Sequence, residues 1–72
     1  MANFAERFKE LRSSNNLTQS DIGKKLDLKI RIIQYYEKNE RYPDFKGLIS
    51  IADFFDVSLD YLVGRSDDPT RY

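Results

Sequence analysis

The chain has 72 residues, with 12 Lys or Arg, 12 Asp or Glu, no histidine and no cysteine. Its length predicts one small domain, and its 40% hydrophobic and 33% charged residues are typical of a folded soluble protein, not a disordered one. The lack of cysteine excludes disulfides and thiolate metal sites, and the lack of histidine removes the commonest catalytic base and metal ligand.

The amino end lacks the basic start and apolar run of a signal peptide, and no apolar run reaches the length of a membrane span. We therefore expect a cytoplasmic protein that does not bind membranes.

The first expected helix runs from Phe4 to about Ser14, because three apolar residues recur there at helical spacing: Phe4, Phe8 and Leu11. A polar turn over residues 13 to 16 follows. Thr18 is then placed to cap a second helix, with Asp21 as the reciprocal acid of a capping box.

The third expected helix runs from Ile30 to Lys38, after a break at residues 27 to 29. At ~100° per residue, its inner arc holds core-like residues and Glu37: Ile32, Ile33, Tyr36 and Glu37. The opposite arc combines cationic, hydrogen-bonding and apolar groups: Ile30, Arg31, Gln34, Tyr35 and Lys38. Such a mixture on an exposed helix face is suited to reading base edges in a DNA major groove.

Asp44 is placed to cap a fourth helix, whose expected buried stripe is Phe45, Leu48, Ile51, Ala52 and Phe55. Ser58 is placed to cap a last helix, with Leu59 and Leu62 facing inward and Gly64 at its end. We expect residues 65–72 to form a mobile polar tail. The predicted fold is an all-α, compact five-helix domain.

The net charge of zero by itself argues against a nucleic-acid-binding protein, but the charges are unevenly distributed. Residues 24 to 41 carry six Lys or Arg against three acidic residues, a local charge of +3. Residues 44 to 68 carry two against six, a local charge of −4. This asymmetry can orient the protein on phosphates, although charge alone favours the alternative of an ordinary solvated surface with accidental clustering.

Three segments resemble the lambda-repressor-like (Xre) family of bacterial and phage DNA-binding proteins. They are LTQSDIGKKL at residues 17–26, IQYYE at residues 33–37 and VSLDYLVG at residues 57–64. The resemblance extends from about Phe4 to Gly64, so we expect a helix-turn-helix DNA-binding domain at residues 1–64, followed by the tail. Asp27 replaces the usual left-handed glycine of the family's turn, and Lys29 replaces the usual Ser or Thr cap.

The resemblance also implies roles for individual residues. It implies base contacts from Ile30, Arg31, Gln34 and Tyr35, with Lys29 at the edge of the groove. From their positions in the chain we also expect phosphate contacts from Gln19, Lys29, Lys38, Arg41 and Tyr42. The resemblance implies an ion pair between Arg12 and Glu37, and subunit contacts around the last helix. There we expect an exposed homodimer patch of Phe54, Tyr61 and Val63. The alternatives are that Ile30 and Tyr35 contact the core or a protein, and that Phe54 packs into the core.

Two functions remain open from the sequence. The first is a sequence-specific transcription regulator, a repressor that binds a palindromic operator in double-stranded DNA as a homodimer. The alternative is a protein-interaction module that uses the apolar face of its third helix. Asp67 and Asp68 supply too few oxygens for a cation site, and the acidic residues Asp53, Asp56 and Asp60 fit capping and surface positions. We expect no enzyme activity, no cofactor and no metal.

Overall fold

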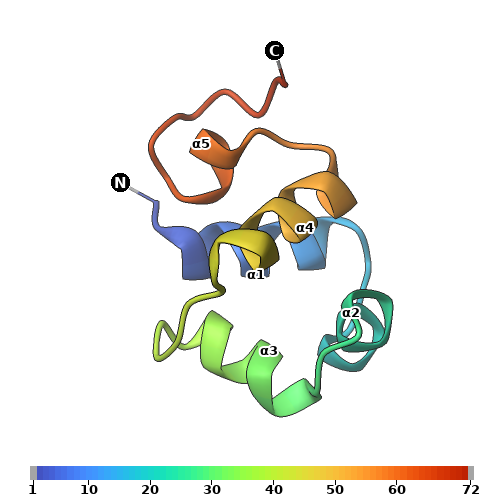
Figure 1. The fold of residues 1–72 in the computed structure, drawn as a ribbon. Helices are drawn as coiled ribbons and strands as arrows, with labels where there is room; N and C mark the ends of the chain where they lie inside the picture. Colours follow the sequence, from blue (N-terminus) through green and yellow to red (C-terminus); the bar gives the residue numbers. More distant parts are fainter. Residues whose placement is uncertain (1, 72) are drawn as a thin grey trace.

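The computed structural model describes residues 2–71, and within that range the chain is all-helical. Its five helices are α1 (Phe4–Ser14), α2 (Gln19–Leu26), α3 (Ile30–Glu37), α4 (Phe45–Phe55) and α5 (Leu59–Leu62). The predicted all-α fold is confirmed. Figure 1 shows α3 at one end of the molecule, with α5 and both chain ends toward the other and α1 and α4 between them.

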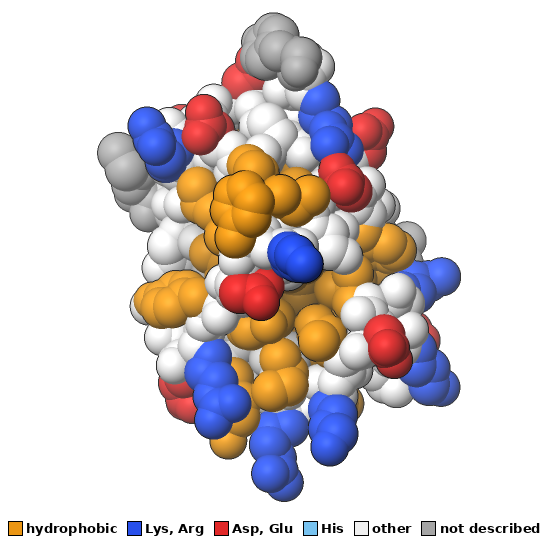
Figure 2. Space-filling view, viewed as in Figure 1, with side chains coloured by type: hydrophobic (Ala, Val, Ile, Leu, Met, Phe, Trp, Pro, Cys, Tyr) orange, Lys and Arg blue, Asp and Glu red, His pale blue; other side chains and the backbone are white. Residues whose placement is uncertain are grey.

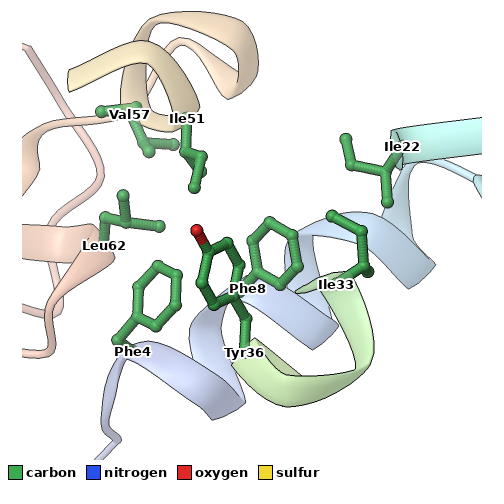
Figure 3. Close-up of a cluster of buried hydrophobic side chains, with 9 residues drawn as sticks. Phe4, Phe8, Ile22, Ile33, Tyr36, Ile51, Val57 and Leu62 are labelled. Carbon is green, nitrogen blue, oxygen red and sulfur yellow. The ribbon is translucent and has the colours of Figure 1, made fainter. Parts of the chain in front are cut away.

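The core takes one fully buried side chain from each helix. These are Phe8, Ile22, Ile33, Ile51 and Leu62, each at most 2% exposed. Aromatic rings of α1 and α3 pack beside them, with ring centroids of Phe4 and Phe8 5.8 and 5.9 Å from that of Tyr36 (Figure 3). Burying one such side chain contributes roughly 1.5–3 kcal/mol. The core therefore holds α3 in place through the buried side of this helix.

The start of α2 is a complete capping box. The Thr18 hydroxyl accepts from the Asp21 backbone N–H at 3.0 Å, and the Asp21 carboxylate accepts from the Thr18 N–H at 2.9 Å. The hydrogen bond from the Thr18 backbone is the main reason that the pKa of Asp21 lies below its ordinary value. The predicted cap is confirmed.

This capping box makes stability depend on pH. Because the pKa of Asp21 is lowered in the folded state, its stabilising effect is present above the unfolded pKa of about 3.9 and disappears as pH falls through the lower folded value. Asp21→Asn should therefore have a lower thermal midpoint than the parent at pH 6, and the difference between the two midpoints should shrink as the pH is lowered below about 3.9. A gap that persists unchanged at low pH would contradict this reading.

The turn between α2 and α3 contains the expected left-handed residue. Asp27 has φ 56°, a conformation that Asp adopts more readily than most residues, and it ends α2 in place of glycine. Lys29, at the start of α3, makes no capping hydrogen bond with its side chain. The first turn of the helix is thus uncapped.

Lys29→Ser should raise the free energy of unfolding by about 1 kcal/mol, because serine supplies the missing acceptor. Lys29→Ala is the matched control, since it removes the charge without adding a cap. Urea denaturation of the three proteins measures the difference. Equal midpoints for the serine and alanine variants would show that the backbone at position 29 does not permit capping.

The prediction of burial is wrong for two residues, Phe45 and Leu59. Phe45 is 73% exposed, because it is the first residue of α4, beyond the level of the core, and Pro43 is the buried residue at this end. Leu59 is 38% exposed. Because α5 has only four residues, only Leu62 reaches the core.

The expectation of a mobile tail is also wrong for residues 65–71, which fold back on the domain. The Ser58 N–H donates to the Pro69 carbonyl at 3.1 Å, and Arg71 Nη2 lies 2.5 Å from the Asp53 carboxylate. Asp67 accepts from Arg7 Nη2 at 2.6 Å. Arg7 is itself buried at 6% exposure, with its guanidinium 3.9 Å from the centre of the Tyr61 ring. The tail thus stabilises the contact between α1 and α5.

Candidate nucleic-acid interface

The close approach of α2 and α3 depends on Gly23. A Cβ atom at this position would lie 2.8 Å from the Leu28 carbonyl oxygen and 3.7 Å from Ile33 Cγ1. The Leu28 N–H in turn donates to the Gly23 carbonyl at 2.7 Å. A side chain here would push the turn away from α2, so the glycine sets the angle at which α3 leaves the turn.

The outer face of α3 is the surface expected from the helical wheel. Ile30 is 48% exposed, Arg31, Gln34 and Lys38 are exposed, and Tyr35 is half-buried. On the inner face, Ile33 and Tyr36 are buried. The four residues expected to contact bases therefore lie on one accessible face of α3. Whether each of them contacts a base remains a prediction.

An ion pair fixes α3 to α1. Arg12 Nε donates to Glu37 Oε2 at 2.6 Å and Arg12 Nη2 donates to Glu37 Oε1 at 3.1 Å, with the two side chains 15% and 5% exposed. Arg12 Nη1 also donates to the Leu17 carbonyl at 2.8 Å. One arginine thus connects α1, the residue before the α2 cap and the end of α3.

Gln19 extends this network to the outer face. Its amide nitrogen donates to Glu37 Oε1 at 3.2 Å, and its oxygen accepts from Gln34 Nε2 at 3.5 Å. The proposed phosphate contact of Gln19 remains a prediction, but the structure gives this residue a further role. Gln19 connects a buried carboxylate to a residue proposed to read bases.

The loop after α3 is folded against the end of the helix. Asn39 has φ 62° and accepts from the Tyr42 hydroxyl at 2.7 Å. The Glu40 N–H donates to the Tyr35 carbonyl at 3.0 Å, and the Arg41 guanidinium lies 4.5 Å from the centre of the Tyr35 ring. Arg41 and Tyr35, assigned separately to phosphate and base, are therefore in contact.

Positive charge gathers beside the outer face. On the side drawn in Figure 2, Lys and Arg side chains cluster at the end of the molecule that holds α3, whereas Asp and Glu are more frequent toward the other end. Lys29, Lys38, Arg41 and Tyr42 are all exposed. The arrangement can hold a phosphate backbone against α3, although the net charge is zero.

The residues of the proposed dimer patch differ in accessibility. Phe54 is 39% exposed and packs edge-to-face on Phe55 with 5.0 Å between ring centroids. Tyr61 and Val63 are half-buried, and Tyr61 is covered by Arg7. Leu59, expected to face the core, is exposed instead. A contact between subunits at this end stays a prediction.

Within residues 2–71 there is no group of three or more His, Cys, Asp or Glu side chains that could hold a metal ion. None of the helices in that range is both long and apolar enough to cross a membrane.

Three comparisons with known proteins agree on one family. A helix-turn-helix domain model matches residues 5–67. The uncharacterized HTH-type transcriptional regulator YqaE of Bacillus subtilis is 41% identical over 66 residues, covering 90% of this chain and 57% of that protein. The cryptic phage CTXphi transcriptional repressor RstR of Vibrio cholerae is 32% identical over 60 residues, covering 83% of this chain and 54% of that protein.

A transcriptional regulator from Listeria innocua has a similar crystal structure, with a TM-score of 0.80 and 36% sequence identity over 85% of this chain and 57% of that one. The chain thus spans little more than half the length of these relatives. Together with the geometry of α2 and α3, the matches show that the chain belongs to the helix-turn-helix family of transcriptional regulators, in agreement with its lambda-repressor-like sequence pattern.

Proposed function

We propose that this domain binds a specific sequence of double-stranded DNA by inserting the outer face of α3 into the major groove. The observation that carries the proposal is this face itself, where Arg31 and Gln34 are exposed beside Ile30 and Tyr35. Arginine pairs with guanine and glutamine with adenine through two hydrogen bonds each, and an isoleucine packs on a thymine methyl group.

The residues that contact phosphates in this proposal lie around the outer face of α3. Lys29 lies at the start of α3, Gln19 at the start of α2, and Lys38, Arg41 and Tyr42 follow the end of α3. They therefore flank α3 at both ends, as a helix lying in the major groove requires.

In this proposal the protein acts in the cytoplasm as a repressor, without a cofactor. Occupying an operator is enough to exclude other proteins from it and needs no catalytic group. The relative RstR is named a phage repressor, which supports the same role for a related domain.

Mobility shifts on random-sequence DNA, repeated at several salt concentrations, test the proposal. Binding should weaken by orders of magnitude between 50 and 200 mM salt if about six or more phosphates are contacted. Sites selected from the random pool should then bind more tightly than the pool itself.

A protein-interaction module is the second candidate, favoured by the exposed apolar residues Ile30, Tyr42 and Phe45 at 48%, 64% and 73%. The same assay separates the two. Absence of a shift even at low salt would overturn the DNA-binding proposal and support the protein-interaction candidate.

The proposal includes a homodimer in which the two subunits contact each other around α5 and the end of α4. A two-fold contact at that end can set two copies of α3 about 34–36 Å apart, one turn of DNA, which suits a palindromic operator. Phe54 is accessible for such a contact, whereas Tyr61 and Val63 contribute only their exposed edges.

Phe54→Glu should abolish dimers in sedimentation and weaken binding to a full palindromic site, because a carboxylate would be buried in the contact. Binding to a half-site should hardly change, and the helical circular-dichroism signal should remain. Lys46→Glu, a charge change elsewhere on α4, is the control. If Phe54→Glu unfolds the domain or leaves dimers intact, the proposed contact is wrong.

A further inference from the structure

A half-open cavity of about 300 Å³ lies between the α2–α3 turn and α4. Its apolar lining includes Leu26 and Leu28 from the turn side and Ile51 from α4, with Ser50 and Asp44 as polar members. An apolar cavity of half this volume accommodates a benzene ring. The space is therefore large enough for one aromatic ring with a small substituent.

Tyr36 from α3 also lines this cavity and is only 8% exposed. Figure 3 shows its hydroxyl directed toward Ile51, a residue of the lining, and away from the backbone of α3. No residue within 2–71 forms a hydrogen bond with this hydroxyl, although the ring itself packs on Phe4 and Phe8. Among the described residues this oxygen is not one of the fully buried unpaired polar atoms, so it is open to the cavity, where a bound molecule can accept its hydrogen bond.

The charges around the cavity select for an uncharged ligand. Asp44 is the one charged residue among the described residues of the lining, and its carboxylate opposes an anion. It already accepts the Gly47 N–H at 2.8 Å as the cap of α4. The positive end of that helix offsets its attraction for a cation.

Burial, and then the Asp44 carboxylate, raises the pKa of Tyr36 above its ordinary value. The hydroxyl therefore remains a hydrogen-bond donor across the physiological pH range.

We propose that this cavity binds a small uncharged molecule with an apolar ring and one hydrogen-bond-accepting oxygen, held by the Tyr36 hydroxyl and the side chains of Leu26, Leu28 and Ile51. The ligand would lie behind α3, on the side opposite to the outer face. Neither the family assignment nor the proposed DNA contacts require this site, and it can be tested without DNA.

Titration of the isotope-labelled protein with benzyl alcohol, followed by amide NMR, tests the proposal. We expect saturable shifts at Leu28, Gly47 and Ile51, whereas the anionic analogue benzoate should bind at least roughly tenfold more weakly. Toluene lacks the oxygen, so its affinity for the protein should be the same with and without the Tyr36 hydroxyl. Shifts that never saturate, that map to another surface, or that are equal for benzoate would overturn the proposal.

Tyr36→Phe is the decisive variant, because it removes only an oxygen that has no hydrogen-bond partner among residues 2–71. It should keep the thermal midpoint and weaken benzyl alcohol binding roughly fivefold, as for loss of one hydrogen bond. Tyr35→Phe on the opposite face is the matched control and should bind like the parent. Ser50→Leu should fill the mouth of the cavity and prevent binding. Unchanged binding in both Tyr36→Phe and Ser50→Leu would overturn the proposal.

Discussion

Replacing Glu37 by alanine is expected to lower the free energy of unfolding by roughly 3–5 kcal/mol, the range for breaking a buried ion pair from one side. The reason is the state in which the substitution leaves Arg12. Its guanidinium would keep the hydrogen bond to the Leu17 carbonyl but lose both bonds to the carboxylate in a site where its side chain is 15% exposed. Since stabilities of small domains are only about 5–15 kcal/mol, thermal unfolding should begin far below that of the parent.

Glu40→Ala provides the control, because Glu40 is an exposed acidic residue three positions away. Its effect should stay within about 0.5 kcal/mol, as for most surface substitutions. A double variant carrying both Arg12→Met and Glu37→Leu should recover much of the loss, since no unpaired charge then remains. If the Glu37 and Glu40 variants shift the thermal midpoint equally, the ion pair does not stabilise the domain.

Arg31→Ala is expected to reduce affinity for the preferred DNA site by roughly 1–3 kcal/mol, the value of one two-bonded base contact. Its side chain is exposed at the start of α3 and makes no ion pair within residues 2–71, so its removal should not alter folding. Binding to random DNA should change less, because that binding depends on phosphates.

Two controls make the result specific. Gln19→Ala, at a proposed phosphate contact, should weaken binding to preferred and random DNA about equally. Arg65→Ala removes an exposed cation that follows α5, the helix that Figure 1 shows at the end opposite to α3, and should leave the preference for the selected site unchanged. A uniform loss of affinity from Arg31→Ala, with sequence preference intact, would reassign this arginine to the DNA backbone.

Most of the helical framework was predictable because its signals are local. Thr18 with Asp21, Asp44 and Ser58 each cap the helix that the sequence assigned to them. The spacing of apolar residues likewise separated the two faces of α3, because a single 3.6-residue period decides which side faces the core. The contact between Arg12 and Glu37 followed only from the family resemblance, since no local pattern joins residues 25 positions apart.

The errors occurred where tertiary packing decides burial. Phe45 and Leu59 have the right periodicity, but each begins its helix and extends past the core. Arg7 is not part of the apolar stripe of Phe4, Phe8 and Leu11, yet it is buried, because Tyr61 and Asp67 enclose it. The tail has the composition of a mobile segment, and its order depends on contacts with Ser58 and Asp53, which sequence patterns do not reveal.

The stack of Arg41 on Tyr35 and the Gln19–Gln34 contact also belong to this tertiary level. Sequence reasoning assigned all four residues to DNA, but one at a time. The structure shows instead that the outer face of α3 is contacted on both sides, by Gln19 at the start of α2 and by Arg41 in the loop after α3.

Amide NMR of the labelled protein during titration with a selected DNA duplex tests most directly whether α3 reads the DNA. The account predicts that the largest shifts map to Ile30, Arg31, Gln34 and Tyr35, with smaller shifts at Lys38 and Arg41 and at the start of α2. Residues of the opposite end, such as Leu59, should change only as far as dimerisation requires. Largest shifts at the α4–α5 end, with α3 unaffected, would contradict it.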